Sequence, residues 1–376
     1  MYKIPLFNLN YGKEEEDAIL ETIRSKWIST GPKCAELEKK FSSAIGSDYS
    51  VSLSNCTSAL HLSLLALGVD ANSEVIVPSL TFSATVNAVK YVDAKPVFCD
   101  IISYDKPTID PRHIERLISN KTKAIIIMHY AGFACEIDDI ISIAKRHNLK
   151  IIEDACHAPF SEYNGQKLGT FGDIGCFSFF SNKNISTGEG GIITTNNKAL
   201  YEKIKLLRSH GMTSLSYDRF QGHATKYDII ELGYNYRMDD MRASLALVQL
   251  EKLNNDIIKR TQIRNAYVEK LSGMDEILIP FQDFKAFSSN YIFPIVLKDS
   301  NYKRREKLRN FLHDKSIQSS VHYPSVHLFS IYSNETCSLP KTEYFSDNEI
   351  SLPMHGQLTS KNLSFIVNVI KDGLVG

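Results

Sequence analysis

The sequence lacks the features that mark several broad classes of protein. No apolar run approaches the ~20 residues that a transmembrane helix needs, and residues 1–10 lack the charged start and long apolar core of a signal peptide. There is no excess charge of one sign, because 43 Lys+Arg balance 43 Asp+Glu. A nucleic-acid-binding protein would need a basic face. We therefore expect a cytoplasmic protein with neither a membrane nor a nucleic acid as partner.

Metal and dinucleotide signatures are also missing. The seven cysteines are scattered and form no CxxC pair, which fits reduced thiols better than a disulfide framework or a zinc site. His129, His322 and His327 have no metal-ligand spacing, so we expect no metal. The glycines of residues 188–191 lack the Gly-x-Gly-x-x-Gly spacing and run into a strand-like segment, which argues against a nicotinamide-binding oxidoreductase.

The alternation of helix and strand patterns predicts the fold class. At 376 residues the chain is too long for one ordinary core, which predicts a large domain and a smaller one. Continuous apolar strands that alternate with helices indicate an α/β domain, with a mostly parallel sheet covered by helices on both faces. The expected strands are 74–78, 95–99, 124–128, 150–153 and 192–195, and the expected helices are 60–67, 81–91, 111–119 and 136–147.

The second half of the chain predicts a smaller α+β domain. Residues 239–267 have the pattern of a long helix that bridges the two domains. We place the large domain, with its N-terminal segment, at residues 1–250 and the smaller C-terminal domain at residues 251–376. The elements expected in the latter are strands 291–297 and 317–321 and helices 303–313 and 361–371.

Three segments carry side chains suited to chemistry, although each has a structural alternative. Small polar residues at 54–58 lead into a helix, where they either bind an anion or cap the helix. Asp154 follows an apolar strand, where it is an active-site carboxylate or a helix cap. Lys183 follows the next apolar strand, and a partly desolvated lysine loses its charge more readily and becomes a nucleophile. The alternative for Lys183 is a lysine that extends from a strand end to solvent.

The order of these segments resembles that of the DegT/DnrJ/EryC1/StrS family of sugar aminotransferases, which are fold type I enzymes dependent on pyridoxal phosphate. The resemblance extends over nearly the whole chain, and its motifs are specific as a set. The matching stretches are 27–32, 55–60, 74–79, 122–126, 153–155, 169–179, 183–184, 188–191, 233–237, 322–324 and 351–354.

The resemblance assigns roles around a pyridoxal phosphate cofactor. Lys183 matches the lysine that forms a Schiff base with the cofactor, and Asp154 matches the partner of its pyridine nitrogen, which lets the ring act as an electron sink. Phe82 matches the residue that stacks on the ring, and His157 falls near the phenolic oxygen. The hydroxyls that match phosphate-binding positions belong to Thr57, Ser58 and Ser178.

The resemblance also implies partners. Asn235 matches a residue that reaches the phosphate from the other subunit, which implies a homodimer with shared active sites. Two segments line the sugar site in relatives, and their residues here are Trp27, Ser29, Thr30, Gly31, His322 and Tyr323. The implied substrates are an amino-acid donor, glutamate, and a nucleotide-linked keto-sugar for cell-surface polysaccharide, of the 4-keto-6-deoxy or 4-keto-pentose type.

Departures from the family pattern leave alternatives open. Cys56 replaces the common glycine, and Ser181-Asn182 replaces the frequent Pro-Thr before the lysine. Residues 129–132 resemble the branches acting on UDP-4-keto-pentose and in pseudaminic acid synthesis. A keto-cyclitol aminotransferase of an aminoglycoside-type pathway is the alternative enzyme, and a non-catalytic regulator on the same fold is the alternative without chemistry. Lys183 argues against the family's dehydratases, which carry histidine at that position.

Overall fold

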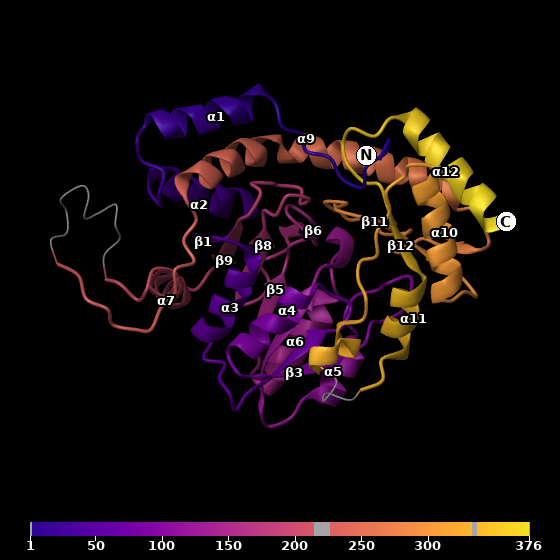
Figure 1. The fold of residues 1–376 in the computed structure, drawn as a ribbon. Coiled ribbons are helices and arrows are strands. Elements are labelled where there is room, and N and C mark those ends of the chain that lie inside the picture. The colour runs from indigo at the N-terminus through magenta and orange to yellow at the C-terminus, as the bar shows by residue number, and fades with distance from the viewer. Residues whose placement is uncertain (1, 214–225, 333–336, 376) are drawn as a thin grey trace.

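A seven-stranded sheet with helices on both faces forms the centre of the protein (Figure 1), whose computed structural model describes residues 2–213, 226–332 and 337–375. The strands of this sheet are β1 (Tyr49–Leu53), β2 (Glu74–Pro78), β3 (Lys95–Cys99), β4 (Thr122–Met128), β5 (Lys150–Asp154), β8 (Ile174–Ser178) and β9 (Gly191–Thr195). Their order is β1-β9-β8-β5-β4-β2-β3, and β9 runs antiparallel to both of its neighbours. The expected mostly parallel α/β sheet is confirmed.

The strands are apolar on both sides because both faces of the sheet are covered. In β2, Val75 and Val77 pack into one hydrophobic core, whereas Ile76 between them packs into another. Ile126 and Ile127 of β4 divide between the same two cores. This arrangement accounts for the continuous apolar runs in the sequence, since adjacent residues of a strand point to opposite faces.

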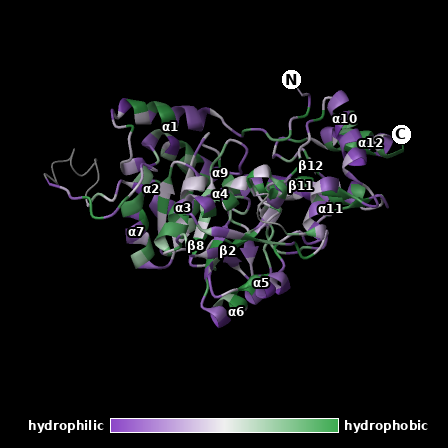
Figure 2. Ribbon diagram, turned by 60° about the horizontal axis from the view of Figure 1, so that its bottom comes forward, coloured by the Kyte–Doolittle hydropathy of each residue, from purple (hydrophilic) through white to green (hydrophobic). Residues whose placement is uncertain are grey.

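Two layers of helices cover the sheet. One face carries α3 (Cys56–Ala66), α4 (Ser83–Tyr91) and α7 (Lys198–Arg208), while the other carries α2 (Pro32–Ile45), α5 (Pro111–Leu117), α6 (Ile137–His147) and part of α9 (Asp240–Leu271). The N-terminal helix α1 (Lys13–Arg24) lies along α9 (Figure 1). Peripheral helices such as α5 and α6 carry hydrophilic residues (Figure 2), as expected for helices with one face in solvent. A short hairpin of β6 (Glu162–Tyr163) and β7 (Gln166–Lys167) and the 3-10 turn η1 (Tyr130–Gly132) complete this part.

A second, smaller sheet has its own core. Its elements are β10 (Ile277–Leu278), β11 (Phe293–Leu297), β12 (Glu349–Leu352), α10 (Tyr302–Asp314), α11 (Pro340–Asn348), α12 (Ser360–Val375) and the 3-10 turns η2 (Val326–Leu328) and η3 (Ser330–Tyr332). The three strands are antiparallel in the order β10-β11-β12. Ile4 from the start of the chain and Tyr267 from α9 pack into this core. The N-terminal segment therefore touches both parts of the protein.

The long helix and one strand refine the sequence expectations. The predicted boundary between residues 250 and 251 falls inside α9, which contributes side chains to the cores of both parts, so that boundary stays a prediction. The expected strand at 317–321 is wrong, because this segment makes only isolated bridges, Ile317 to Ile4 and Ser320 to Ser351. Across the described ranges, no helix combines the length and apolar character needed to cross a membrane.

Candidate active site

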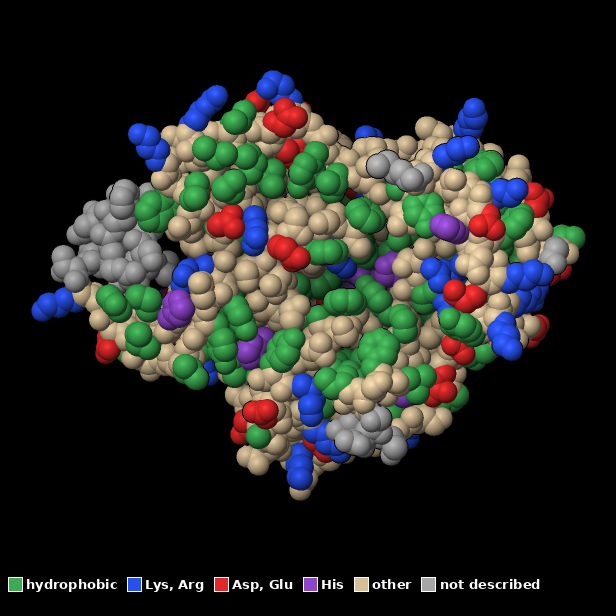
Figure 3. All heavy atoms as spheres, in the orientation of Figure 1, with side chains coloured by type: hydrophobic (Ala, Val, Ile, Leu, Met, Phe, Trp, Pro, Cys, Tyr) green, Lys and Arg blue, Asp and Glu red, His purple; other side chains and the backbone are tan. Residues whose placement is uncertain are grey.

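A cavity of about 1050 Å³ lies beyond the carboxyl ends of the parallel strands, between the two sheets. Parallel α/β sheets place ligands at this edge. Figure 3 shows the face of the molecule hollowed near its centre, with histidine and basic side chains among hydrophobic ones. The cavity brings together nine of the predicted site residues, which are Thr57, Ser58, Phe82, Asp154, His157, Ser178, Lys183, His322 and Tyr323.

The first turn of α3 forms one wall of the cavity. Asn55 caps the helix, and its side-chain oxygen accepts hydrogen bonds from the N–H (2.8 Å) and the hydroxyl (2.9 Å) of Ser58. A helix leaves its first N–H groups without intrahelical partners, which makes such a turn an anion site. Gly191 of β9 lies directly behind it, and a Cβ there would come within 2.6 Å of the Asn55 carbonyl carbon. The turn is therefore held tightly against the sheet.

Asp154 ends β5, and its carboxylate is fixed by two donors. Its Oδ2 accepts a hydrogen bond from the Thr85 hydroxyl at 2.7 Å, and its Oδ1 accepts one from the Cys156 N–H at 3.2 Å. The Thr85 hydroxyl oxygen lies 2.8 Å from that of Thr81, from which it accepts a hydrogen bond in turn. Because Asp154 is only 4% exposed, the carboxylate cannot turn into bulk water. The buried acid faces the cavity in one orientation.

Lys183 reaches the cavity from the turn that follows β8. Its Nζ lies 4.2 Å from the centre of the Tyr291 ring. Burial lowers the pKa of the amine, but the acidic groups of Tyr291, Cys156 and Asp154 raise it more, so the pKa lies above its usual value. The expected effect of desolvation is therefore present, but it does not decide the net direction of the Lys183 pKa in these surroundings. The nearby acids outweigh the loss of water.

His157 is held as a neutral ring at the back of the cavity. Burial lowers its pKa well below the usual value, and Lys183 and His322 act in the same direction. Its Nδ1 accepts a hydrogen bond from the Ala131 N–H at 3.3 Å, and its Nε2 lies 2.8 Å from the Tyr323 hydroxyl. The hydrogen-bond network thus assigns the ring proton to Nε2, which donates to Tyr323.

Residues 320–324, which lie between α10 and α11, supply another part of the wall. His322 is neutral, because burial and the charge of Lys183 lower its pKa to about 3, and its Nδ1 lies 2.8 Å from the Ser351 hydroxyl. Phe82, which precedes α4, is 58% exposed, and its ring centre lies 5.9 Å from that of Tyr323. A large exposed aromatic side chain at a cavity offers a flat surface for a ring.

Five of the predicted site residues lie outside the cavity of this chain. Residues 27–31, which include Trp27, Ser29, Thr30 and Gly31, connect α1 to α2, and the Gly31 N–H donates to Asp240 at the start of α9 (2.9 Å). Asn235 pairs through its backbone with Ser209, in the segment that precedes α9. The role predicted for Asn235 requires a second subunit, and the roles of all five residues stay predictions.

Some functional neighbours had no signal in the sequence. Thr85 and Tyr291 contact Asp154 and Lys183, yet neither follows a motif, since they come from a helix start and from the smaller domain. The three histidines considered as metal ligands are separately engaged: His129 Nε2 lies 2.9 Å from a Glu153 carboxylate oxygen, and His327 Nδ1 lies 2.6 Å from the Ser79 hydroxyl. Within the described ranges, a different group has metal-ligand spacing, formed by Cys56, Asp154 and Cys156.

The residues around the cavity suit a flat, anionic cofactor that carries an aldehyde. The first turn of α3 offers N–H groups to an anion, Phe82 presents a flat surface, and Asp154 is a buried acid able to pair with a ring nitrogen. Lys183 supplies the amine that reacts with an aldehyde. These four features lie on one cavity, although they come from distant parts of the sequence.

Comparisons with known proteins are consistent with a site for such a cofactor. The model of the DegT/DnrJ/EryC1/StrS aminotransferase family matches residues 10–371. The chain is 36% identical over 375 residues to the GDP-perosamine synthase of Escherichia coli O157:H7, covering 99% of each protein. It resembles the structure of Spr1654 from Streptococcus pneumoniae in its PMP form (TM-score 0.93, 30% identity, 99% of each chain). It also resembles Helicobacter pylori PseC, an aminotransferase involved in the biosynthesis of pseudoaminic acid (TM-score 0.92, 30% identity, 98% of each chain).

Proposed function

Because this chain belongs to the DegT/DnrJ/EryC1/StrS aminotransferase family, we propose that it transfers the amino group of glutamate to a nucleotide-linked keto-sugar. Its class follows from the family: it is a sugar aminotransferase dependent on pyridoxal phosphate. The observation that carries the proposal is the single cavity where Lys183 and Asp154 of the large domain face His322 and Tyr323 of the smaller one. The acceptor is a 4-keto-6-deoxy sugar or a 4-keto-pentose, and the product serves a cell-surface polysaccharide.

We assign the cofactor contacts to residues already found on the cavity. When bound, pyridoxal phosphate supplies an aldehyde that takes up the amino group and a ring that accepts electrons. The hydroxyls of Thr57, Ser58 and Ser178 and the first turn of α3 hold its phosphate. Phe82 packs against the ring, and neutral His157 donates to the phenolic oxygen or orients Tyr323 beside it.

Lys183 and Asp154 have different roles in the proposed reaction. Asp154, held by Thr85 and the Cys156 N–H, keeps the ring nitrogen protonated, which strengthens the electron-accepting character of the ring. In the first half of the reaction, Lys183 Nζ would take the proton from the α-carbon of the amino donor. It would then deliver that proton to the former aldehyde carbon of the cofactor, which carries the amino group afterwards. In the second half, the same amine moves a proton to the carbon of the sugar that was the ketone. General acid–base catalysis of this kind needs the amine free and neutral at that step.

The proposed active site is shared between two subunits. Asn235 of one subunit binds the cofactor phosphate of the other, and residues 27–31 line the sugar site across the same interface. Next to Asn235 the chain presents an exposed apolar segment, in which Ile229, Ile230 and Leu232 are 59%, 60% and 83% exposed. Such a concentration of exposed apolar side chains is typical of an interaction surface.

A mixed-subunit experiment tests the shared site. Asn235→Ala removes one phosphate contact, and we expect an activity loss of about tenfold from the loss of one charge-assisted hydrogen bond. Co-expression of Lys183→Ala chains with Asn235→Ala chains yields hybrid dimers with one intact site, so activity returns to about a quarter of the wild-type level, as expected for random pairing in a two-fold dimer. Light scattering checks the dimer. Activity no greater than the sum of the two separate variants would show that each site belongs to one chain.

The acceptor is tested by the second half of the reaction alone. The enzyme, converted to its pyridoxamine form with glutamate, is mixed with UDP-, GDP- and dTDP-linked 4-keto- and 3-keto-sugars and with keto-cyclitols. We expect a nucleotide-linked 4-keto sugar to restore the absorbance of the aldehyde form within one turnover. Restoration by a cyclitol alone would replace the proposed acceptor with the aminoglycoside-type one, and failure of glutamate to start the cycle would overturn the proposed donor.

A further inference from the structure

Two cysteines that take no part in the proposed transfer meet inside the cavity. Cys56 opens α3, and Cys156 lies two residues beyond Asp154 at the end of β5. Although the two are 100 positions apart in the sequence, their Sγ atoms lie 3.0 Å apart. Both residues line the cavity. The chain has a thiol where its family commonly has a glycine, at Cys56, and that thiol contacts a second one.

The surroundings of the two sulfurs link them to both ends of the cofactor site. The Sγ atoms and a carboxylate oxygen of Asp154 all lie within 4.8 Å of one another. Cys56 precedes Thr57 and Ser58 in the first turn of α3, and the Cys156 N–H donates to Asp154. A bond between the sulfurs would therefore tie the phosphate-binding turn directly to the segment that holds the acid.

We propose that Cys56 and Cys156 are a redox-active dithiol, and that peroxide joins them in a disulfide which weakens cofactor binding. Cys156, the more exposed of the two, attacks one oxygen of hydrogen peroxide, so that its sulfur becomes a sulfenic acid and water leaves. The Cys56 sulfur then attacks that sulfur, the S–S bond forms, and a second water leaves. The two thiols lose two protons and two electrons, and the peroxide accepts both.

The disulfide weakens cofactor binding because it moves the turn. An S–S bond is about 2.05 Å long, so the sulfurs must approach one another by about 1 Å. Since Gly191 packs directly behind Asn55, the turn has little freedom to shift without disturbing its hydrogen bonds. The proposal concerns the cofactor site alone and holds whichever keto compound is the acceptor.

The pH dependence of the oxidation follows from the groups that face the thiols, which are Asp154, Lys183 and Cys176. The hydrogen bond with Cys156 and burial raise the pKa of Cys56 well above its usual value. The hydrogen bond between the two thiols lowers the pKa of Cys156, but burial and Asp154 outweigh it and leave that pKa raised as well. Because thiolates react and thiols do not, oxidation is slow near neutral pH and accelerates as the pH rises.

The experiment treats the holoenzyme with a small excess of hydrogen peroxide at pH 7 and pH 9. Intact-mass and peptide mass spectrometry follow the thiols, and the absorbance of the bound cofactor reports its retention. We expect a loss of roughly 2 Da, a peptide that joins Cys56 to Cys156, and faster reaction at pH 9. Cofactor affinity should fall about tenfold, corresponding to one charge-assisted hydrogen bond, and dithiothreitol should restore it.

Matched variants identify the pair. Cys56→Ser and Cys156→Ser should each prevent both the joined peptide and the reversible loss of cofactor, whereas Cys337→Ser, at an exposed position outside the cavity, should behave as the wild type. Peptide mapping of the wild type decides the matter even if a variant fails to fold. Wild-type protein that keeps Cys56 and Cys156 as separate thiols at pH 9, or that forms the disulfide without losing cofactor affinity, would overturn the proposal.

Discussion

Replacing Lys183 with alanine will abolish turnover and the covalent attachment of the cofactor. No other lysine lines the cavity formed by the described residues, so no second amine is at hand to react with the aldehyde or to move the proton. A positioned general acid–base group raises the reaction rate by about 10²- to 10⁴-fold. Because the variant loses both this group and the covalent step, we expect kcat to fall by at least about 10⁴-fold. Steady-state rates, the absorbance of the bound cofactor and borohydride trapping measure the effect.

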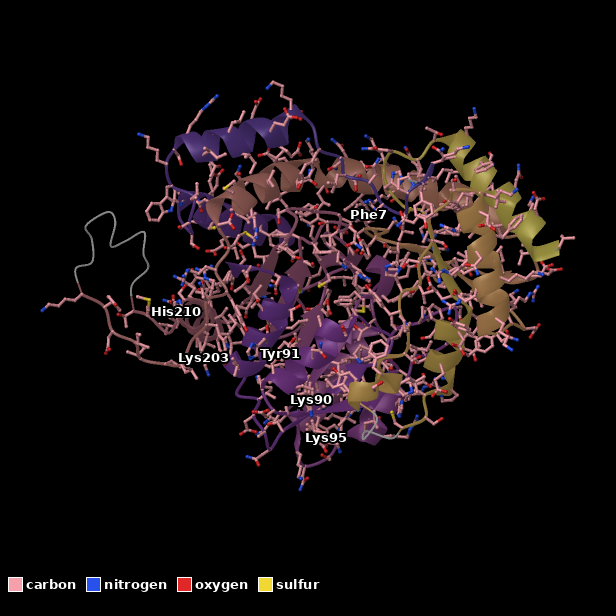
Figure 4. All side chains as sticks on the ribbon, viewed as in Figure 1. Phe7, Lys90, Tyr91, Lys95, Lys203 and His210 are labelled. Atoms are coloured by element: carbon pink, nitrogen blue, oxygen red, sulfur yellow. The ribbon has the colours of Figure 1, made fainter. Side chains whose placement is uncertain are left out.

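Lys90 provides a matched control for this change. It lies on α4, the helix that carries Thr85, yet its side chain is exposed on the outer surface (Figure 4). Lys90→Ala should keep the wild-type rate and the wild-type absorbance. A Lys183→Ala protein with substantial transaminase activity would remove the chemical basis of the site, and borohydride labelling of a different lysine would show that another amine holds the cofactor.

Replacing Asp154 with asparagine will produce the second large effect. Asparagine has almost the same shape, but it carries no charge to hold the ring nitrogen protonated, and the ring then accepts electrons poorly. We expect kcat/KM to fall about 10³-fold, or about 4 kcal/mol of transition-state stabilisation. The cofactor should still bind covalently, because Lys183 is unchanged. Rates of the glutamate half-reaction, measured by stopped-flow absorbance, isolate this step from sugar binding.

The control for Asp154 is an exposed acid. Asp105→Asn changes the same charge at an exposed position and should leave the rate unaltered. Thr85→Val adds a graded test, since the Thr85 hydroxyl donates to Asp154 at 2.7 Å and orients it. An Asp154→Asn enzyme with a normal glutamate half-reaction would show that this carboxylate does not act on the ring nitrogen.

Secondary structure in the sheet region was readable from local pattern. The apolar segment expected as a strand at 74–78 is β2, and the strand expected at 95–99 is β3. Strands buried on both faces need continuous apolar residues, and the intervening polar turns mark their ends. The segment 317–321 is apolar only at Ile317 and Val321, and it forms no strand. Its backbone bridges two different neighbours instead of one partner strand, which depends on tertiary position.

The two groups that we propose carry the chemistry were also predictable from the sequence, whereas their immediate partners were not. Asp154 ends β5 and Lys183 lies in the turn that follows β8, and parallel strands bring such ends to one edge. Thr85 and Tyr291 carry no such mark, although they contact those two groups. The sequence predicted the desolvation of Lys183 but not the net direction of its pKa, which is raised by acids that the fold brings near.

By itself, the sequence determined the α/β class, the order of the elements and the family, and it predicted the pair of groups in the proposed chemistry. These depend on local periodicity and on residues at fixed offsets from strand ends, which need no long-range information. Only the tertiary structure decided that His322 and Tyr323 face Lys183 across one cavity, and that Cys56 touches Cys156. Contacts between residues 100 or more positions apart arise from how layers pack, and packing is set by the whole chain at once.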